Sequence, residues 1–296
     1  MLIDAHVHVQ RPKLVGRAAG NRYPEAGLLI SMLDAHGIDK AVCMCRMNPE
    51  CAYTFITPDE ILDICRTYPD RLYPLANLDP RMLLNRPDTD FGPYLRAYRD
   101  AGCRGIGEYV ANLPFDDPWQ MNVFRQVEEA GLPLTFHIGP TLGNCYGCYD
   151  DPGLPRLEKV LRECPRLTML GHSQPFWAEI SAGVTPQSRA GYPTGKVTPG
   201  RVVELMRRYP NLLGDLSARS GHNALTRDPE FGFRFMEEFQ DRLLFATDIA
   251  NCGQELPIVP WFREVKDKRL ISSEAWEKIA WRNANRVFRL GLPEAG

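Results

Sequence analysis

Amphipathic helical segments alternate with short apolar segments along the chain, and this alternation constrains the fold most strongly. Residues 57–69, TPDEILDICRTYP, have apolar side chains at the 3.6-residue spacing of a helix, with Thr57 as a cap and Pro69 at the end. Residues 198–210, TPGRVVELMRRYP, repeat the pattern. Each segment precedes a strand-like run, RLYPLANLD at 71–79 and NLLGDLSA at 211–218. The repeated unit is therefore a helix followed by a strand.

Eight such units fill the 296 residues. Strands are expected near 2–9, 39–46, 71–78, 103–110, 132–138, 167–173, 211–217 and 243–249. Helices are expected near 25–36, 58–68, 91–101, 119–131, 154–164, 199–209, 230–240, 255–267 and 273–288. The alternation predicts an α/β fold, a (β/α)8 TIM barrel, as a single domain over residues 1–296. We expect a loop insertion near 174–200, rich in Gly, Pro, Ser and Thr from 181, over the barrel mouth.

Charge and hydropathy point to a small-molecule partner. Lys and Arg number 35 against 37 Asp and Glu, with no basic block, so neither nucleic acid nor an anionic membrane is an expected partner. No apolar stretch has membrane-spanning length, and residues 1–10 lack the pattern of a signal peptide, so we expect a cytoplasmic protein. A homodimer is the ordinary expectation for a soluble barrel enzyme.

The nine cysteines fit free thiols in a reducing compartment better than a disulfide framework. Cys145 and Cys148 form one CxxC motif, but no second pair follows at the spacing of a zinc ribbon. Ordinary loop thiols are therefore favoured over a structural zinc site.

Polar side chains end most of the predicted strands, where a barrel of this type carries its chemistry. In chain order they are His6, His8, Arg46, Asn77, Asp79, Glu108, His137, His172, Asp215, Arg219 and Asp248. Any one of them alone would usually be a satisfied polar residue or a helix cap. Together, four imidazoles and two carboxylates at one mouth are costly to bury, and a divalent cation is the simplest compensation. His6 and His8 lie on one strand face and can share such an ion.

Five of these strand ends, DAHVHV, GIGE, FHIG, GHS and ATD, resemble the amidohydrolase superfamily in their order along the chain. The similarity is to the amidohydrolase 2 branch, which is related to aminocarboxymuconate semialdehyde decarboxylase-like enzymes and TatD-type metal-dependent hydrolases. The resemblance implies one or two divalent ions per chain, zinc first and manganese second.

By the same resemblance, His6, His8 and Asp248 bind the more buried ion. Glu108 either bridges two ions or is a carboxylate paired with Arg219 or Arg46. His137 and His172 would bind a second ion. With one ion only, His137 is its third imidazole ligand, and His172 polarises the substrate or moves a proton.

The resemblance leaves two reactions open. The first is hydrolysis of a C–O or C–N bond in a lactone, ester or amide, with Asp248 and His172 as catalytic residues and a metal-activated water as the nucleophile. The second is nonoxidative decarboxylation of an unsaturated or aromatic acid by nearly the same residues. A barrel that binds a metabolite without catalysis is the third reading.

An anionic substrate is expected from the arginines at the predicted mouth. Guanidinium groups bind carboxylates in bidentate fashion, so Arg46 and Arg219 are candidate substrate ligands, together with His222 and Tyr109. The alternative is that the arginines pair with Asp79 or Glu108 within the protein.

Overall fold

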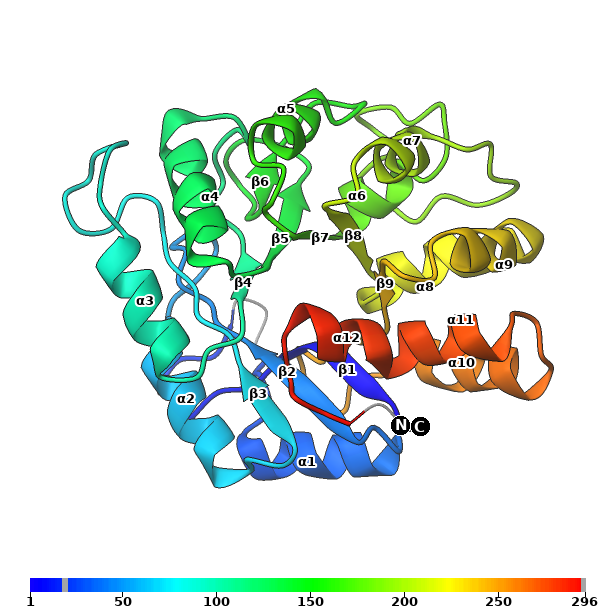
Figure 1. The fold of residues 1–296 in the computed structure, drawn as a ribbon, viewed down its shortest axis with the longest axis horizontal. Coiled ribbons are helices and arrows are strands. Elements are labelled where there is room, and N and C mark those ends of the chain that lie inside the picture. The colour runs from blue at the N-terminus through cyan, green and yellow to red at the C-terminus, as the bar shows by residue number, and fades with distance from the viewer. Residues whose placement is uncertain (18–20, 294–296) are drawn as a thin grey trace.

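Parallel strands form the centre of the computed structural model, which describes residues 1–17 and 21–293 (Figure 1). A three-stranded sheet has the order β1-β2-β3, and a second sheet has the order β4-β5-β7-β8-β9, with β6 beside β5. The strand bounds are β1 Ile3–His8, β2 Lys40–Met44, β3 Leu72–Pro74, β4 Ile106–Tyr109, β5 Leu134–Gly139, β6 Cys148–Tyr149, β7 Met169–His172, β8 Leu212–Asp215 and β9 Leu243–Leu244.

Two parallel bridges join the sheets at their edges. Ala76, which follows β3, pairs with Ile106 of β4, and Val7 of β1 pairs with Ile249, which follows β9. At the second junction the His8 backbone N–H also donates to the Ile249 carbonyl at 2.8 Å. All eight strand segments predicted from the sequence are thus present, and they run round the centre in chain order as the TIM-barrel prediction requires.

Helices surround the strands on the outside (Figure 1). Their bounds are α1 Ala26–Ala35, α2 Pro58–Thr67, α3 Gly92–Asp100, α4 Pro118–Ala130, α5 Pro155–Glu163, α6 Gln174–Ala178, α7 Arg201–Arg208, α8 Ala218–Thr226, α9 Pro229–Glu238, α10 Ile258–Asp267, α11 Ser273–Glu277 and α12 Asn283–Val287. A π-helical turn, Lys278–Arg282, joins α11 to α12 within the predicted helix 273–288. The sequence analysis missed the short helices α6 and α8.

Helix α2 illustrates how the local sequence specifies these elements. The Thr57 side chain accepts a hydrogen bond from the Glu60 backbone N–H at 3.2 Å, and Pro58 occupies the first turn. The stripe that contains Ile61, Ile64 and Cys65 is buried against the barrel. Capping and periodicity therefore act together, as the sequence pattern predicted.

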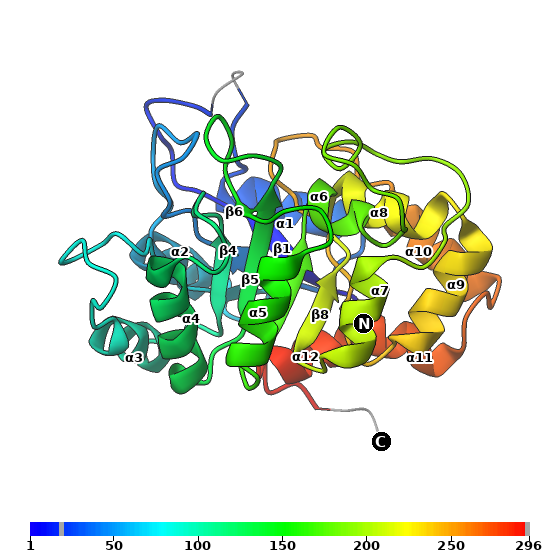
Figure 2. The same cartoon turned by 90° about the horizontal axis from the view of Figure 1, so that it is seen from above.

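The loops that follow the strands lie along one side of the molecule, uppermost in Figure 2. Among them is the irregular segment after α6, in which Ser181 pairs antiparallel with Pro199. Arg189 in this segment is buried and donates to the Asp150 carbonyl at 2.6 Å. This bond ties the long segment down to the barrel.

The described cysteines are all free thiols. Cys145 lies near the Thr141 carbonyl, whereas Cys148 is buried beside Gln120. Neither belongs to a metal-ligand cluster of the described residues, and Cys148 lies in β6 and not in a loop. Within residues 1–17 and 21–293, the helices are all too short or too polar to cross a membrane.

Gly171 packs closely against α6, and this contact leads to a prediction about stability. A Cβ atom at this position of β7 would overlap the buried ring of Phe176. We expect Gly171→Ala to lower the free energy of unfolding by about 1–3 kcal/mol, as overpacking usually does. Urea denaturation measures this. Gly27→Ala, where the new Cβ would meet only the Tyr68 hydroxyl at 4.0 Å, is the matched control and should not destabilise the protein.

Candidate metal centre

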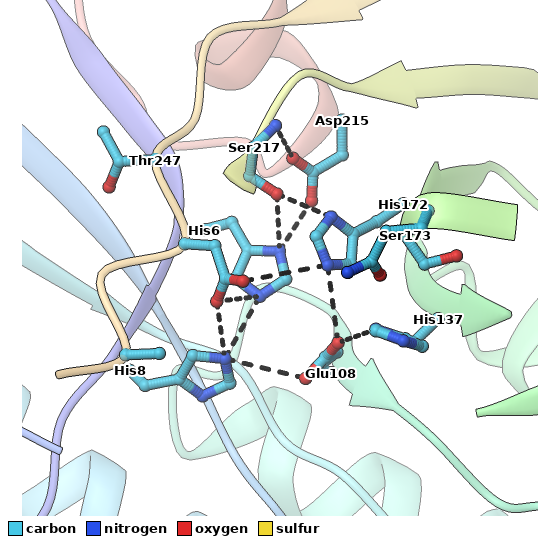
Figure 3. A network of polar contacts seen from close by, with 12 residues as sticks. His6, His8, Glu108, His137, His172, Ser173, Asp215, Ser217 and Thr247 are labelled. Carbon is cyan, nitrogen blue, oxygen red and sulfur yellow. Dashed lines mark hydrogen bonds and ion pairs between the residues drawn. The ribbon is translucent and has the colours of Figure 1, made fainter. Parts of the chain in front are cut away.

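Six side chains from β1, β4, β5, β7 and the segment after β9 converge at the mouth of the barrel, and all but Asp248 are labelled in Figure 3. Five of them are at most 11% exposed, and Asp248, at 23%, is the most open. They are the six residues that the sequence analysis named as candidate metal ligands, namely His6 and His8 on β1, Glu108 on β4, His137 on β5, His172 on β7, and Asp248 after β9. The fold therefore brings the predicted ligands into one buried cluster.

His6, His8 and Asp248 have the geometry of a metal-binding group. The Nε2 atoms of His6 and His8 are 3.2 Å apart, and Asp248 Oδ1 lies 3.7 Å and 3.3 Å from them, respectively. Tetrahedral ligands that bind zinc at 2.0–2.1 Å lie about 3.3 Å from one another. Two imidazole nitrogens and a carboxylate oxygen at this spacing fit a divalent ion.

Glu108 lies between this group and a second pair of histidines, His137 and His172. Its Oε2 atom is 3.6 Å from His8 Nε2, whereas Oε1 is 2.8 Å from His137 Nδ1 and 3.7 Å from His172 Nε2. The Asn77 side chain holds the Glu108 backbone carbonyl at 2.6 Å. Among the described residues no arginine forms an ion pair with Glu108, so the predicted alternative of an Arg46 or Arg219 partner is not found.

The two carboxyl groups of the cluster and that of the neighbouring Asp215 are ionised at neutral pH. Burial opposes this, but hydrogen bonds with His137, His6 and His8, together with the positive charge of His6, outweigh burial. The pKa of Glu108 lies well below its usual value for this reason, and the pKa values of Asp215 and Asp248 are also lowered. Three negative charges thus lie in a space shielded from water.

Among the histidines with a shifted pKa, only His6 carries a positive charge that offsets these carboxylates. Burial lowers the pKa of His8 and brings the pKa of His172 to about 4, so both rings are neutral. Burial also acts against a charge on His6, but Asp215 outweighs it and raises the pKa of His6 to about 10. A divalent cation that displaced the His6 Nε2 proton would compensate the excess negative charge, which is the second sign that the residues fit an ion.

Second-layer contacts orient the candidate ligands. Asp215 Oδ2 lies 2.6 Å from His6 Nδ1, and Ser217 Oγ lies 2.7 Å from His172 Nδ1. Asp4 is buried and accepts the backbone N–H of Thr247 at 2.9 Å, which fixes the turn that carries Asp248. The sequence placed Asp215 at a strand end without giving it a role, and gave no role to Asp4 or Ser217. Only the position of Asp4 two residues before His6, and of Ser217 two residues after the strand-end Asp215, could have drawn attention to them.

Arg46 lies beside the cluster, in agreement with its predicted position at the mouth. Its guanidinium carbon is 4.3 Å from the centre of the Tyr146 ring, and that ring is 4.7 Å from the imidazole of His137. The pairing of Arg46 with Asp79, one predicted alternative, does not occur, because Arg81 binds Asp79 at 2.6 Å. Arg46 is buried, and its Nε has no hydrogen-bond partner among the described residues.

The other predicted substrate ligands make different contacts in the structure. Arg219 stacks on the ring of Tyr192 at 4.7 Å, and His222 meets Trp261 edge-on at 5.9 Å. Tyr109 is fully buried in the core, because strand alternation turns it to the face opposite Glu108. None of these three contacts the cluster in the described interactions, and our proposal below leaves all three out.

The structure reveals a second arginine–tyrosine pair that the sequence analysis missed. The ring of Tyr23 stacks on His8 at 4.9 Å, and Arg17 lies 4.3 Å from the centre of the Tyr23 ring. Both pairs line one cleft at the mouth, together with Tyr53 and Thr54. Neither Arg17 nor Arg46 forms an ion pair with a carboxylate among the described residues.

Solved structures share this fold. An uncharacterized TIM-barrel protein from Bordetella bronchiseptica has 16% identity and a TM-score of 0.65, with 98% of each chain covered. A probable 2-pyrone-4,6-dicarboxylic acid hydrolase from Acinetobacter baumannii has 17% identity and a TM-score of 0.59, covering 97% of this chain and 99% of its own. A 5-carboxyvanillate decarboxylase from Sphingomonas paucimobilis has 16% identity and a TM-score of 0.61, covering 97% and 98%.

These identities establish the fold alone, and no curated protein sequence matches the chain. The family is established by the sequence model for amidohydrolases of the amidohydrolase 2 type, which matches residues 3–290. The match spans every strand and all the candidate metal ligands. The chain is therefore a member of the amidohydrolase family with a TIM-barrel fold.

Proposed function

We propose that this protein is a metal-dependent hydrolase that cleaves a C–O or C–N bond of a small, carboxylate-bearing substrate such as a lactone, ester or amide. The observation that carries this proposal is the position of Glu108. Its carboxylate is buried between the two histidine groups, where it can accept a proton beside the ion. Decarboxylation needs a second carboxylate beside the ion less than hydrolysis does.

His6, His8 and Asp248 would hold one ion, and the nitrogen and oxygen donors suit zinc first and manganese second. A divalent ion in such a site supplies an acidified water and polarises a substrate carbonyl.

Side chains of the protein then accept and donate the proton. Asp248 Oδ1 faces the histidine pair, and Oδ2 lies 3.9 Å from His172 Nε2. Asp248 can therefore take a proton from the attacking water and return it to the leaving group, with Glu108 as the neighbouring acceptor. The neutral His172 ring polarises the substrate carbonyl, because a neutral imidazole can donate a hydrogen bond to a developing oxyanion.

The cleft supports an anionic substrate. Arg17 and Arg46 both line it without a carboxylate partner from the described residues, and each lies over a tyrosine ring that contacts a histidine of the cluster. A carboxylate bound there by a guanidinium group would lie beside the ion site. The substrate is thus expected to carry its acid group a short distance from the reacting bond.

Nonoxidative decarboxylation of an unsaturated or aromatic acid is the second candidate. It is favoured by Tyr23 and Tyr146, whose rings flank the cleft and suit a flat substrate. The solved structures of similar fold include proteins named as a hydrolase and as a decarboxylase, so both reactions have a precedent on this fold. Product analysis distinguishes them, because only decarboxylation releases carbon dioxide.

Metal content tests the site directly. Elemental analysis of protein purified without added metal or chelator should give about one zinc or manganese ion per chain. After chelation, zinc should raise the melting temperature, because an ion at a thousand times its Kd stabilises the folded state by about 4 kcal/mol.

Asp248→Asn should abolish this zinc-dependent shift, since it removes an anionic ligand. Asp116→Asn, in a carboxylate that pairs with Arg156 away from the site, should keep the shift. Wild-type protein that neither contains metal nor responds to zinc or manganese would contradict the proposal. About two ions per chain would instead assign Glu108 to a bridge between them.

Glu108→Gln separates hydrolysis from decarboxylation. The amide keeps the shape of the side chain but cannot accept a proton, so hydrolysis in a screen of lactones, esters and amides should fall at least about a hundredfold. The variant should still bind about one ion, which elemental analysis checks. Glu163→Gln, at a more exposed acid paired with Arg125, is the control. Undiminished turnover in Glu108→Gln would favour the decarboxylase.

Substrate recognition is tested at Arg46 with benzoate as the probe. Isothermal titration of the zinc-loaded protein should show binding that weakens about tenfold or more in Arg46→Gln, because a charged hydrogen bond contributes about 1.5–3 kcal/mol. Arg207→Gln, in an exposed pair with Glu238, should bind benzoate as the wild type does. Equal affinity in all three proteins would remove Arg46 from the substrate site.

A further inference from the structure

Ser217 places a buried hydroxyl group between two imidazoles of the cluster (Figure 3). Its Oγ atom is 2.7 Å from His172 Nδ1 and 3.5 Å from His6 Nδ1. The Ser217 backbone N–H donates to Asp215 Oδ1 at 3.0 Å, which holds the residue at the end of β8. The hydroxyl is therefore fixed at the side of each ring that faces away from the candidate ion site.

The contacts of His6 decide which way the Ser217 hydroxyl can donate. Asp215 Oδ2 is 2.6 Å from His6 Nδ1, and a carboxylate only accepts hydrogen bonds. His6 Nδ1 therefore donates its hydrogen to Asp215. The same atom has no lone pair left to accept from Ser217.

His172 Nδ1 is then the remaining acceptor for the Ser217 hydroxyl hydrogen among the described contacts of that oxygen. A buried hydroxyl hydrogen without an acceptor is costly, so the hydroxyl donates to His172. This bond places a lone pair on His172 Nδ1. With Nδ1 as an acceptor, the ring carries its hydrogen on Nε2.

The Nε2–H group of His172 points into the reaction space. Nε2 lies 3.7 Å from Glu108 Oε1 and 3.9 Å from Asp248 Oδ2, too far for direct hydrogen bonds but within reach of a bound atom between them. The opposite tautomer would aim a lone pair at two carboxylate oxygens. It would also leave the Ser217 hydrogen without an acceptor.

We propose that Ser217 is a positioning residue that holds His172 in the Nε2–H tautomer, so that His172 donates a hydrogen bond to the substrate oxyanion instead of binding an ion. This role rests on the hydrolase proposal. It also predicts a single ion at His6, His8 and Asp248, because Glu108 and His137 alone make a poor second site. No proton leaves His172 in this role, since its Nε2–H group donates a hydrogen bond without transferring the proton.

The tautomer of His172 can be measured directly. Long-range ¹H–¹⁵N correlation spectra of zinc-loaded protein labelled with ¹⁵N-histidine distinguish Nδ1–H from Nε2–H rings, and His172→Gln assigns the signal. The wild type should show His172 protonated on Nε2. Ser217→Ala should show a mixture of tautomers or a shift to Nδ1–H, and Ser217→Thr, which keeps the hydroxyl, should restore the wild-type pattern.

The matched control is Ser220→Ala. Ser220 is also buried, lies on α8 close to Ser217, and has a hydroxyl without a partner among the described residues. This variant should keep the His172 tautomer. Ser217→Ala should also retain one zinc ion per chain, while kcat falls about tenfold or more and KM changes little.

Two results would overturn the proposal. One is a wild-type His172 ring that is protonated on Nδ1 or bound to zinc through Nε2. This measurement uses the wild type, so it tests the proposal even if Ser217→Ala does not fold. The other is an unchanged His172 tautomer in Ser217→Ala. Failure of the hydrolase proposal is separable, because absence of hydrolysis or of bound zinc would leave the Nε2–H signal of His172 in place.

Discussion

The hydrogen bond from His6 Nδ1 to Asp215 is the interaction on which the candidate metal centre depends. It joins the first and seventh barrel strands through two side chains that are at most 1% exposed. With Nδ1 committed to the carboxylate, His6 Nε2 faces His8 at 3.2 Å, and the two nitrogens can meet at one ion. The same bond leaves His172 as the acceptor for the Ser217 hydroxyl hydrogen. The tautomer of His172 therefore also depends on it.

Burial and charge explain why the site is a candidate ion centre and not a structural network. Glu108, Asp215 and Asp248 are kept ionised by imidazoles, although burial acts against it. An ion-pair network that balanced its own charges would need no cation, but the pKa values of His8 and His172 are lowered, so these two rings do not offset the three carboxylates. Like charges that are left uncompensated in a low-dielectric space are typical of sites that bind a ligand.

Much of the fold and of the ligand set could be predicted from the sequence. The strands near residues 3–8, 106–109 and 134–139 follow from apolar runs with turn signals, and the polar residue near each strand end was recognisable as a site candidate. Helix α6 was missed because five residues give too little periodicity, and α8 was missed because its buried face consists mostly of the small residues Ser220, Gly221 and Ala224. Ser217 was missed as well, since a lone serine after a strand is usually a cap.

The sequence by itself determined the barrel and its ring of polar strand ends, because periodicity, capping and strand alternation are local properties of the chain. Only the tertiary structure decided which of the polar residues meet. It placed Tyr109 in the core and Arg219 against Tyr192, and it brought Arg17 beside Arg46 at one cleft. The physical reason is that a hydrogen bond or a stacked ring depends on distances of a few ångströms between segments remote in the chain, and no local pattern encodes those distances.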